Sequence, residues 1–253
     1  TLNLSECESL KNIDGLANLT NLTTLNLSEC ESLKNIDGLA NLTSLTTLNL
    51  FNSQALKNVD VLANLTNLTT LAFSSCDTLE NVDVLANLTN LTELSLSSCP
   101  IKNVDGLANL TKLTRVFLGG CYDLENVDGM ANLYNLAQLS IKVCSTLKNV
   151  DGLVNLTNLN TINFWECYDL ENVDGLINST NLTWLDLIDC RVLKNVDGLA
   201  NMTNLNYLTI IDCKELKNID SLVNLTNLTS LSLSGCYKLR PEPLDKNNAY
   251  RLD

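Results

Sequence analysis

Residues 1–20 read TLNLSECESLKNIDGLANLT, and residues 24–43 repeat them letter for letter. The chain is therefore built from a unit of 23 residues. A sequence that returns at a fixed interval of about 20 to 50 residues is typical of architectures in which similar units stack along one axis. This stretch predicts a chain that grows by stacking and needs no single central core.

Ten cysteines mark the unit along the chain. Ser53 fills the one missing place, and every step is 23 residues except the step from Cys99 to Cys121, which is 22. The shorter unit begins Cys99-Pro100-Ile101 and has one residue fewer before its next apolar position. The cysteines are Cys7, Cys30, Cys76, Cys99, Cys121, Cys144, Cys167, Cys190, Cys213 and Cys236.

Within a unit the pattern is L-x-x-L-x-L-x-x-C, as in residues 22–30. The alternation of apolar residues at Leu25 and Leu27 predicts a strand. Apolar residues then follow at a spacing of three and favour a short, tight helical segment. This is the leucine-rich-repeat signature, with Cys where Asn is common. It predicts an α/β repeat fold: a curved leucine-rich-repeat solenoid with a parallel sheet on its concave face and short helical or 3-10 segments on its convex face.

The repeats predict one domain of eleven strands over residues 1–240. No linker or low-complexity stretch interrupts this range. Pro241 and Pro243 stop the pattern, and we expect a polar C-terminal tail over residues 241–253.

Two short runs also carry a resemblance to known repeats. Residues 16–27, LANLTNLTTLNL, resemble the internalin-type repeats of bacterial surface proteins. The run LNLSEC followed by NIDGL resembles the cysteine-bearing leucine-rich repeats of some bacteria and protozoa. The resemblance covers nearly the whole chain and implies the solenoid fold. It implies no particular partner, because this architecture serves many unrelated tasks.

Composition narrows the function classes. The formal charge of -13 argues against nucleic acid, whose phosphates need a basic surface, and against docking on anionic membranes. No run of about 18 apolar residues occurs, so no inserted membrane helix is expected. The chain has no His, the commonest general base, and no Gly-rich phosphate loop or zinc motif, so we expect no enzyme activity and no cofactor.

The cysteines and a matching row of aspartates each allow two interpretations. Isolated cysteines, one per unit, favour a buried ladder of free thiols over a metal site or a disulfide framework. One Asp per unit begins the helical segment, where it could cap backbone N–H groups; a calcium array would need more oxygen ligands. The row is Asp14, Asp37, Asp60, Asp83, Asp105, Asp128, Asp151, Asp174, Asp197 and Asp220.

The residues six, four and two places before each Cys should face the concave side of the sheet. Five of the twelve aromatic residues fall on these positions, including both tryptophans. Aromatic and Arg side chains gathered on one surface are typical of protein interfaces. The predicted partner-binding residues are Arg115, Phe117, Lys142, Trp165, Trp184, Ile188, Tyr207 and Ile211, with Tyr122 and Tyr168 on one rim. An acidic end is expected from Glu166, Asp186, Asp189 and Asp212.

The favoured function is therefore a protein-recognition module that binds a partner macromolecule on its concave face. One alternative is a structural or surface-coat array with no single partner. A second is ice or crystal-surface binding through the outer row Thr20, Thr43, Thr66, Thr89 and Thr111, whose regularity then breaks. Ten unpaired thiols favour a reducing, cytoplasmic compartment, whereas the internalin-like resemblance implies a bacterial cell surface.

Overall fold

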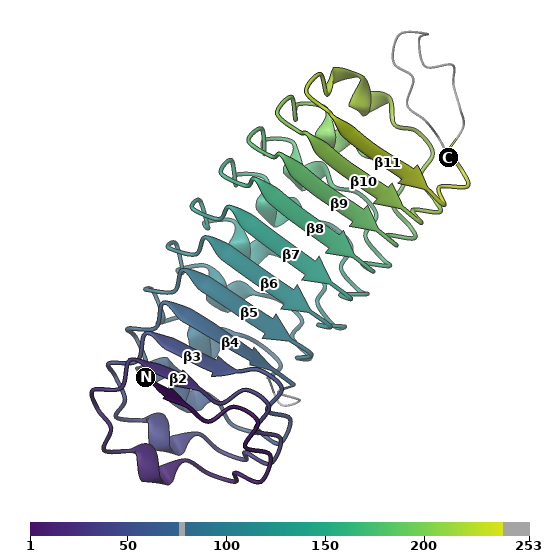
Figure 1. Cartoon of the computed structure of the whole chain (residues 1–253). Helices are drawn as coiled ribbons and strands as arrows, with labels where there is room; N and C mark the ends of the chain where they lie inside the picture. The colour runs from purple at the N-terminus through teal and green to yellow at the C-terminus, as the bar shows by residue number, and fades with distance from the viewer. Residues whose placement is uncertain (76–78, 240–253) are drawn as a thin grey trace.

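The computed structural model describes residues 1–75 and 79–239, so Cys76 and the tail predicted from residue 241 lie outside the described residues. The described chain forms one open parallel sheet in which each strand pairs with the strands of the units before and after it (Figure 1). The predicted eleven strands and the leucine-rich-repeat solenoid are confirmed. The strands are β1 (Leu2–Asn3), β2 (Thr24–Asn26), β3 (Thr47–Leu50), β4 (Thr70–Ser74), β5 (Glu93–Ser97), β6 (Arg115–Gly119), β7 (Gln138–Lys142), β8 (Thr161–Trp165), β9 (Trp184–Ile188), β10 (Tyr207–Ile211) and β11 (Ser230–Ser234).

A short 3-10 helix lies behind the sheet in each of the first ten units (Figure 1). The predicted spacing of three is confirmed, since Leu33, Ile36, Leu39 and Leu42 are all fully buried. The helices are η1 (Asp14–Leu16), η2 (Asp37–Leu39), η3 (Asp60–Asn64), η4 (Asp83–Leu85), η5 (Asp105–Leu107), η6 (Asp128–Met130), η7 (Asp151–Leu153), η8 (Asp174–Leu176), η9 (Asp197–Leu199) and η10 (Asp220–Asn224).

Alternation along the strands divides core from surface. In β2, Leu25 is fully buried, whereas Thr24 and Asn26 on the opposite side are half-buried. The same register holds through the 22-residue unit, where Glu93 pairs with Arg115. The turn at Cys99–Ile101 is therefore one residue shorter than in the other units, and the strand pairing of the sheet continues across it.

The cysteines form the predicted buried ladder. Seven of the nine described cysteines are buried, and Cys7 and Cys236 at the two ends are half-buried. The thiol of Cys30 donates to the carbonyl of Leu4 in the preceding unit at 3.2 Å, and the hydroxyl of Ser53 makes the equivalent bond to Leu27 at 3.1 Å. Burial raises the pKa of Cys167 to about 12, which keeps this thiol protonated and unreactive.

The predicted capping role of the aspartates is wrong. Each Asp is the first helical residue, and no side chain caps the helices from the residue before it. The backbone N–H of Asp151 instead donates to Oδ1 of Asn149, two residues earlier, at 3.2 Å. This Asx turn recurs in nine units. A side chain at the first helical position lies beyond the N–H groups it was expected to bind, so Asn does the capping.

Candidate functional site

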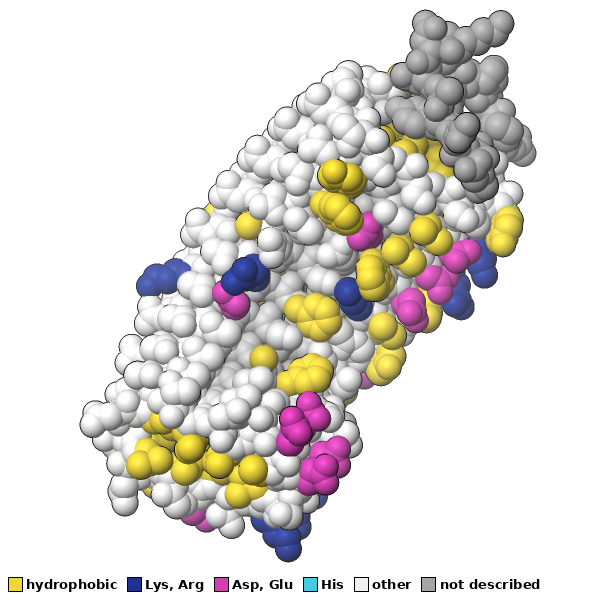
Figure 2. All heavy atoms as spheres, in the orientation of Figure 1, with side chains coloured by type: hydrophobic (Ala, Val, Ile, Leu, Met, Phe, Trp, Pro, Cys, Tyr) yellow, Lys and Arg dark blue, Asp and Glu magenta, His cyan; other side chains and the backbone are white. Residues whose placement is uncertain are grey.

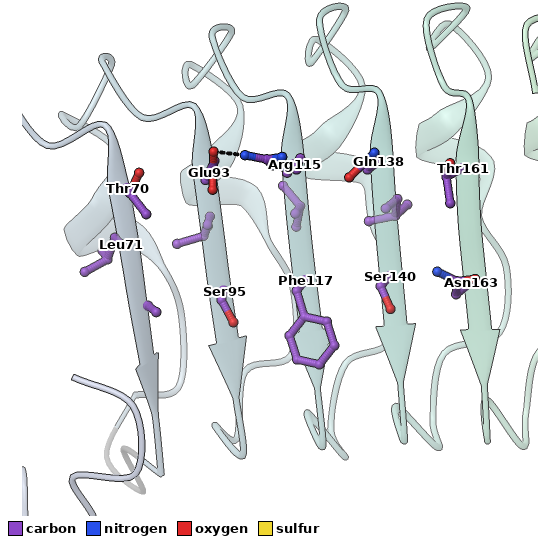
Figure 3. A pocket seen from close by; sticks show the side chains of 14 residues that line it. Thr70, Leu71, Glu93, Ser95, Arg115, Phe117, Gln138, Ser140, Thr161 and Asn163 are labelled. Atoms are coloured by element: carbon purple, nitrogen blue, oxygen red, sulfur yellow. Dashed lines mark hydrogen bonds and ion pairs between the residues drawn. The ribbon is translucent and has the colours of Figure 1, made fainter. Parts of the chain in front are cut away.

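The outer face of the sheet is hollowed over β4 to β8. The hollow has a volume of about 370 Å³ and a floor formed by small side chains, among them Ala72, Ser95 and Ser140. Figure 3 shows it between two larger groups, Arg115 on one side and the Phe117 ring on the other. Gly119 leaves room for this ring, because a Cβ there would lie 2.8 Å from a Phe117 ring carbon.

Arg115 does not present a free charge. Its guanidinium forms an ion pair with Glu93 on the neighbouring strand, and both side chains are exposed at one edge of the hollow (Figure 3). The sequence prediction placed Arg115 on this face correctly but missed Glu93. The positive charge of Arg115 is therefore balanced by an acidic group from β5.

A lysine links the aromatic residues of β6 and β8. The ammonium group of Lys142 on β7 lies 3.7 Å from the centre of the Trp165 ring and 5.9 Å from that of Phe117. Each contact is a cation–π interaction. Three of the predicted site residues are thus brought together, with Trp165 still 37% exposed.

A second aromatic group lies at the opposite ends of the strands. The rings of Trp184 and Tyr207 stack with centres 4.8 Å apart, and the two side chains are 41% and 46% exposed. The indole Nε1 of Trp184 donates to Oδ2 of Asp186 at 2.9 Å. Trp165 pairs with Ile188 and Trp184 with Thr161, so the tryptophans lie diagonally across neighbouring strands.

Apolar and acidic residues continue this surface at the strand ends. Ile188 and Ile211 are half-buried neighbours on β9 and β10. Figure 2 shows hydrophobic side chains gathered over β8 to β10, with acidic side chains beside them. Glu166, Asp189 and Asp212 each follow a strand in a backbone conformation with positive φ. Of the predicted acidic end, only Asp186 lies within the sheet face and is buried, at 7% exposed.

The two predicted rim tyrosines lie in different environments. Tyr122 is exposed and lines a second hollow of about 330 Å³ beside Cys99 and Pro100, where the shortened unit lacks one residue. Tyr168 is half-buried and donates its hydroxyl to Glu166 at 2.6 Å, and this bond raises the pKa of Tyr168. Arg191, which was not predicted, lies 4.1 Å from the centre of the Tyr168 ring.

Arg191 also forms two hydrogen bonds to the carboxylate of Asp189, each 2.9 Å long. This carboxylate raises the pKa of Arg191. The sequence offers one indication of this contact: Asp189 and Arg191 lie on either side of the buried Cys190.

Within residues 1–75 and 79–239, no group of three or more His, Cys, Asp or Glu residues is arranged to hold a metal ion. Across the same residues, no helix has the length and apolarity needed to cross a membrane.

Two family models match the chain. A BspA-type leucine-rich repeat region matches residues 3–125 in six copies, and the leucine-rich-repeat domain of the endo-β-N-acetylglucosaminidase EndoS matches residues 85–181. The chain is a leucine-rich-repeat protein. Among curated proteins, none matches it in sequence.

Several solved structures share the fold of this leucine-rich-repeat protein. An internalin (InlF) of Listeria monocytogenes has a TM-score of 0.55 at 22% identity, over 88% of this chain and 86% of that one. The leucine-rich-repeat domain of the type III effector XopL has a TM-score of 0.66 at 18% identity, over 89% and 82%. Toll of Drosophila, solved in its complex with Spätzle, has a TM-score of 0.62 at 17% identity, over 90% of this chain but 35% of that one. At these identities the likeness establishes the fold alone. Leucine-rich-repeat proteins generally act as protein-interaction modules.

Proposed function

We propose that this protein binds a partner protein on the outer face of its sheet, over strands β6 to β10. The observation that carries the proposal is the exposure of both tryptophans on that face, at 37% and 41%. An array that served only as a spacer would gain nothing from large aromatic groups in water, whereas Trp and Tyr supply much of the binding energy at protein interfaces.

The contacts within the face support an arrangement formed before binding. Lys142 lies against Trp165, and Trp184 is held both by Tyr207 and by its bond to Asp186. Side chains that are already ordered lose less conformational entropy when a partner docks. The face combines two exposed aromatic groups with an apolar row at the strand ends, which suits a partner with an apolar centre and charges of both signs.

The test compares three forms of the chain as bait. The double substitution Trp165→Ala with Trp184→Ala should weaken partner binding by at least about 2 kcal/mol, the usual effect at an interface hot spot. The control is Tyr134→Ala, because Tyr134 is also an exposed aromatic residue, at 52%, but lies in a turn outside the strands. Partners are captured from a lysate, identified, and titrated against each form.

The Tyr134→Ala control should unfold at nearly the same denaturant concentration as the starting chain. The double variant should unfold at a somewhat lower concentration, because it loses the Trp184–Tyr207 stack and the bond to Asp186, so binding is compared under conditions where both variants are folded. Equal capture by the double variant and by the Tyr134→Ala control would sink the proposal. Loss of binding in both would point to a surface outside the sheet.

A further inference from the structure

We infer that Asp186, with the stacked rings of Trp184 and Tyr207 beside it, receives an arginine side chain of the partner protein. The inference rests on the proposed function and names the chemistry that this part of the face recognises. The Asp186 site consists of Asp186, Trp184, Tyr207 and Asn163.

The Asp186 carboxylate is buried and has no cationic partner among the described residues. It is 7% exposed and accepts a hydrogen bond from the neutral Nε1 of Trp184 at 2.9 Å, to Oδ2. The Asn163 amide, also neutral, donates to the same oxygen at 2.8 Å in the amide orientation that gives both of its atoms a partner. Four ion pairs form within the described residues, and none of them includes Asp186. A buried carboxylate without a cationic partner is costly in free energy, so a cation that reaches it is favoured.

Two aromatic rings lie beside this carboxylate. The Trp184 and Tyr207 rings stack on neighbouring strands, with their centres 4.8 Å apart, and more than a third of each side chain is open to solvent. A guanidinium group is planar and binds both to carboxylates and to aromatic faces. The Asp186 site offers both kinds of contact side by side.

The same chain shows a filled version of this arrangement on its rim. Arg191 lies over the Tyr168 ring at 4.1 Å and forms two hydrogen bonds to Asp189. There the arginine comes from the chain itself. At the Asp186 site the aromatic rings and the carboxylate are present, and the described residues supply no arginine to them.

The net charge of the chain and of this part of its surface acts in the same direction. Glu166, Asp189 and Asp212 follow the ends of β8, β9 and β10, and the whole chain carries a net charge of -13. Figure 2 shows acidic side chains beside the hydrophobic surface over the same strands. A surface of one sign attracts an oppositely charged partner and speeds its approach.

The competing interpretation gives Asp186 a structural role alone, in which its carboxylate only holds the Trp184 indole. The probe that separates the two is N-acetyl-arginine amide, with N-acetyl-citrulline amide as its neutral isostere. The readout is the pair of indole N–H signals in the NMR spectrum of the 15N-labelled chain, assigned with Trp165→Phe. The second indole, on the neighbouring strand, is an internal reference.

Arginine amide should shift the Trp184 indole signal to saturation, and citrulline amide should leave it in place. Asp186→Asn, which keeps the shape and removes the charge, should weaken binding about tenfold or more, a change expected for loss of a charge-assisted pair. Asp151→Asn removes one charge from the opposite side of the molecule and should leave binding unchanged. The comparison of the two amides needs no variant and stands even where Asp186→Asn fails to fold.

Equal shifts with arginine amide and citrulline amide, or unchanged arginine binding by folded Asp186→Asn, would overturn the inference. A shift of the Trp165 signal alone would overturn it as well. Should arginine amide fail to bind while a partner is still captured through the two tryptophans, this inference fails and the proposed function stands.

Discussion

One residue in every unit takes up a left-handed backbone conformation directly before the cysteine position. The φ angles there lie between 52° and 67°, and only two of these eleven positions are glycine. Asn, Ser, Asp and Glu fill most of the others. Val143 is the β-branched exception, with φ of 57°. Left-handed conformations crowd the Cβ atom, and branching at Cβ increases the crowding.

Val143→Asn should therefore stabilise the protein, by about 1 kcal/mol, since Asn tolerates this conformation and already occupies it at position 52. Placing valine at the same position of another unit, by Gly120→Val at φ of 63°, should destabilise the protein by about 1–2 kcal/mol. Urea unfolding of the three chains measures both effects. Val143→Asn unfolding at lower urea than the starting chain would show that packing of the valine outweighs its backbone strain.

At the scale of the element, sequence periodicity predicted more than sequence chemistry did. Strands and helical segments could be predicted from the spacing of apolar residues, because that spacing follows the geometry of the backbone in each element. The identity of the capping residue could not be predicted in this way. Asn149 and Asp151 are both of residue types that cap helices well, and only the turn geometry decides between them. Likewise the contact of Glu93 with Arg115 depends on strand register across the shortened unit, and the burial of Asp186 depends on where the Trp184 ring lies.

The cap can be tested within a single unit. Asn149→Ala removes the acceptor of the Asp151 N–H and should destabilise the protein by about 1 kcal/mol, the usual effect of losing a cap. Asp151→Ala keeps that bond. It loses the favourable placement of a negative charge in the first turn, worth about 0.3–1 kcal/mol at the surface. Burial and charge repulsion together raise the pKa of Asp174, and the change also relieves part of this repulsion. The ratio of the two losses in urea unfolding decides between the residues. A larger loss for Asp151→Ala would restore the aspartate as the cap.

At the scale of the whole molecule, each unit is a surface for the next one. The stability of such a solenoid is close to a sum of terms for single units and for the contacts between neighbours. The glycine that follows the helix Asp shows how tight these contacts are. A Cβ at Gly152 would lie 2.4 Å from the carbonyl oxygen of Val127 in the preceding unit. Gly15 fills the same place in the first unit, and a Cβ there would meet nothing within 4 Å.

Gly152→Ala and Gly15→Ala are thus the same chemical change with and without a preceding unit. Gly152→Ala should destabilise the protein by about 1–3 kcal/mol, because the stacked backbones must move apart. Gly15→Ala should leave stability unchanged or raise it by up to about 1 kcal/mol, since alanine restricts the unfolded chain. Val61, Val84 and Ser221 occupy this place in other units, and two of their helices, η3 and η10, are five residues long, so the surrounding backbone adjusts where a larger side chain is present. Calorimetric or urea unfolding of both variants measures the difference. Equal losses would mean that the glycine serves its own unit, and the contact between neighbouring units would then contribute little at this position.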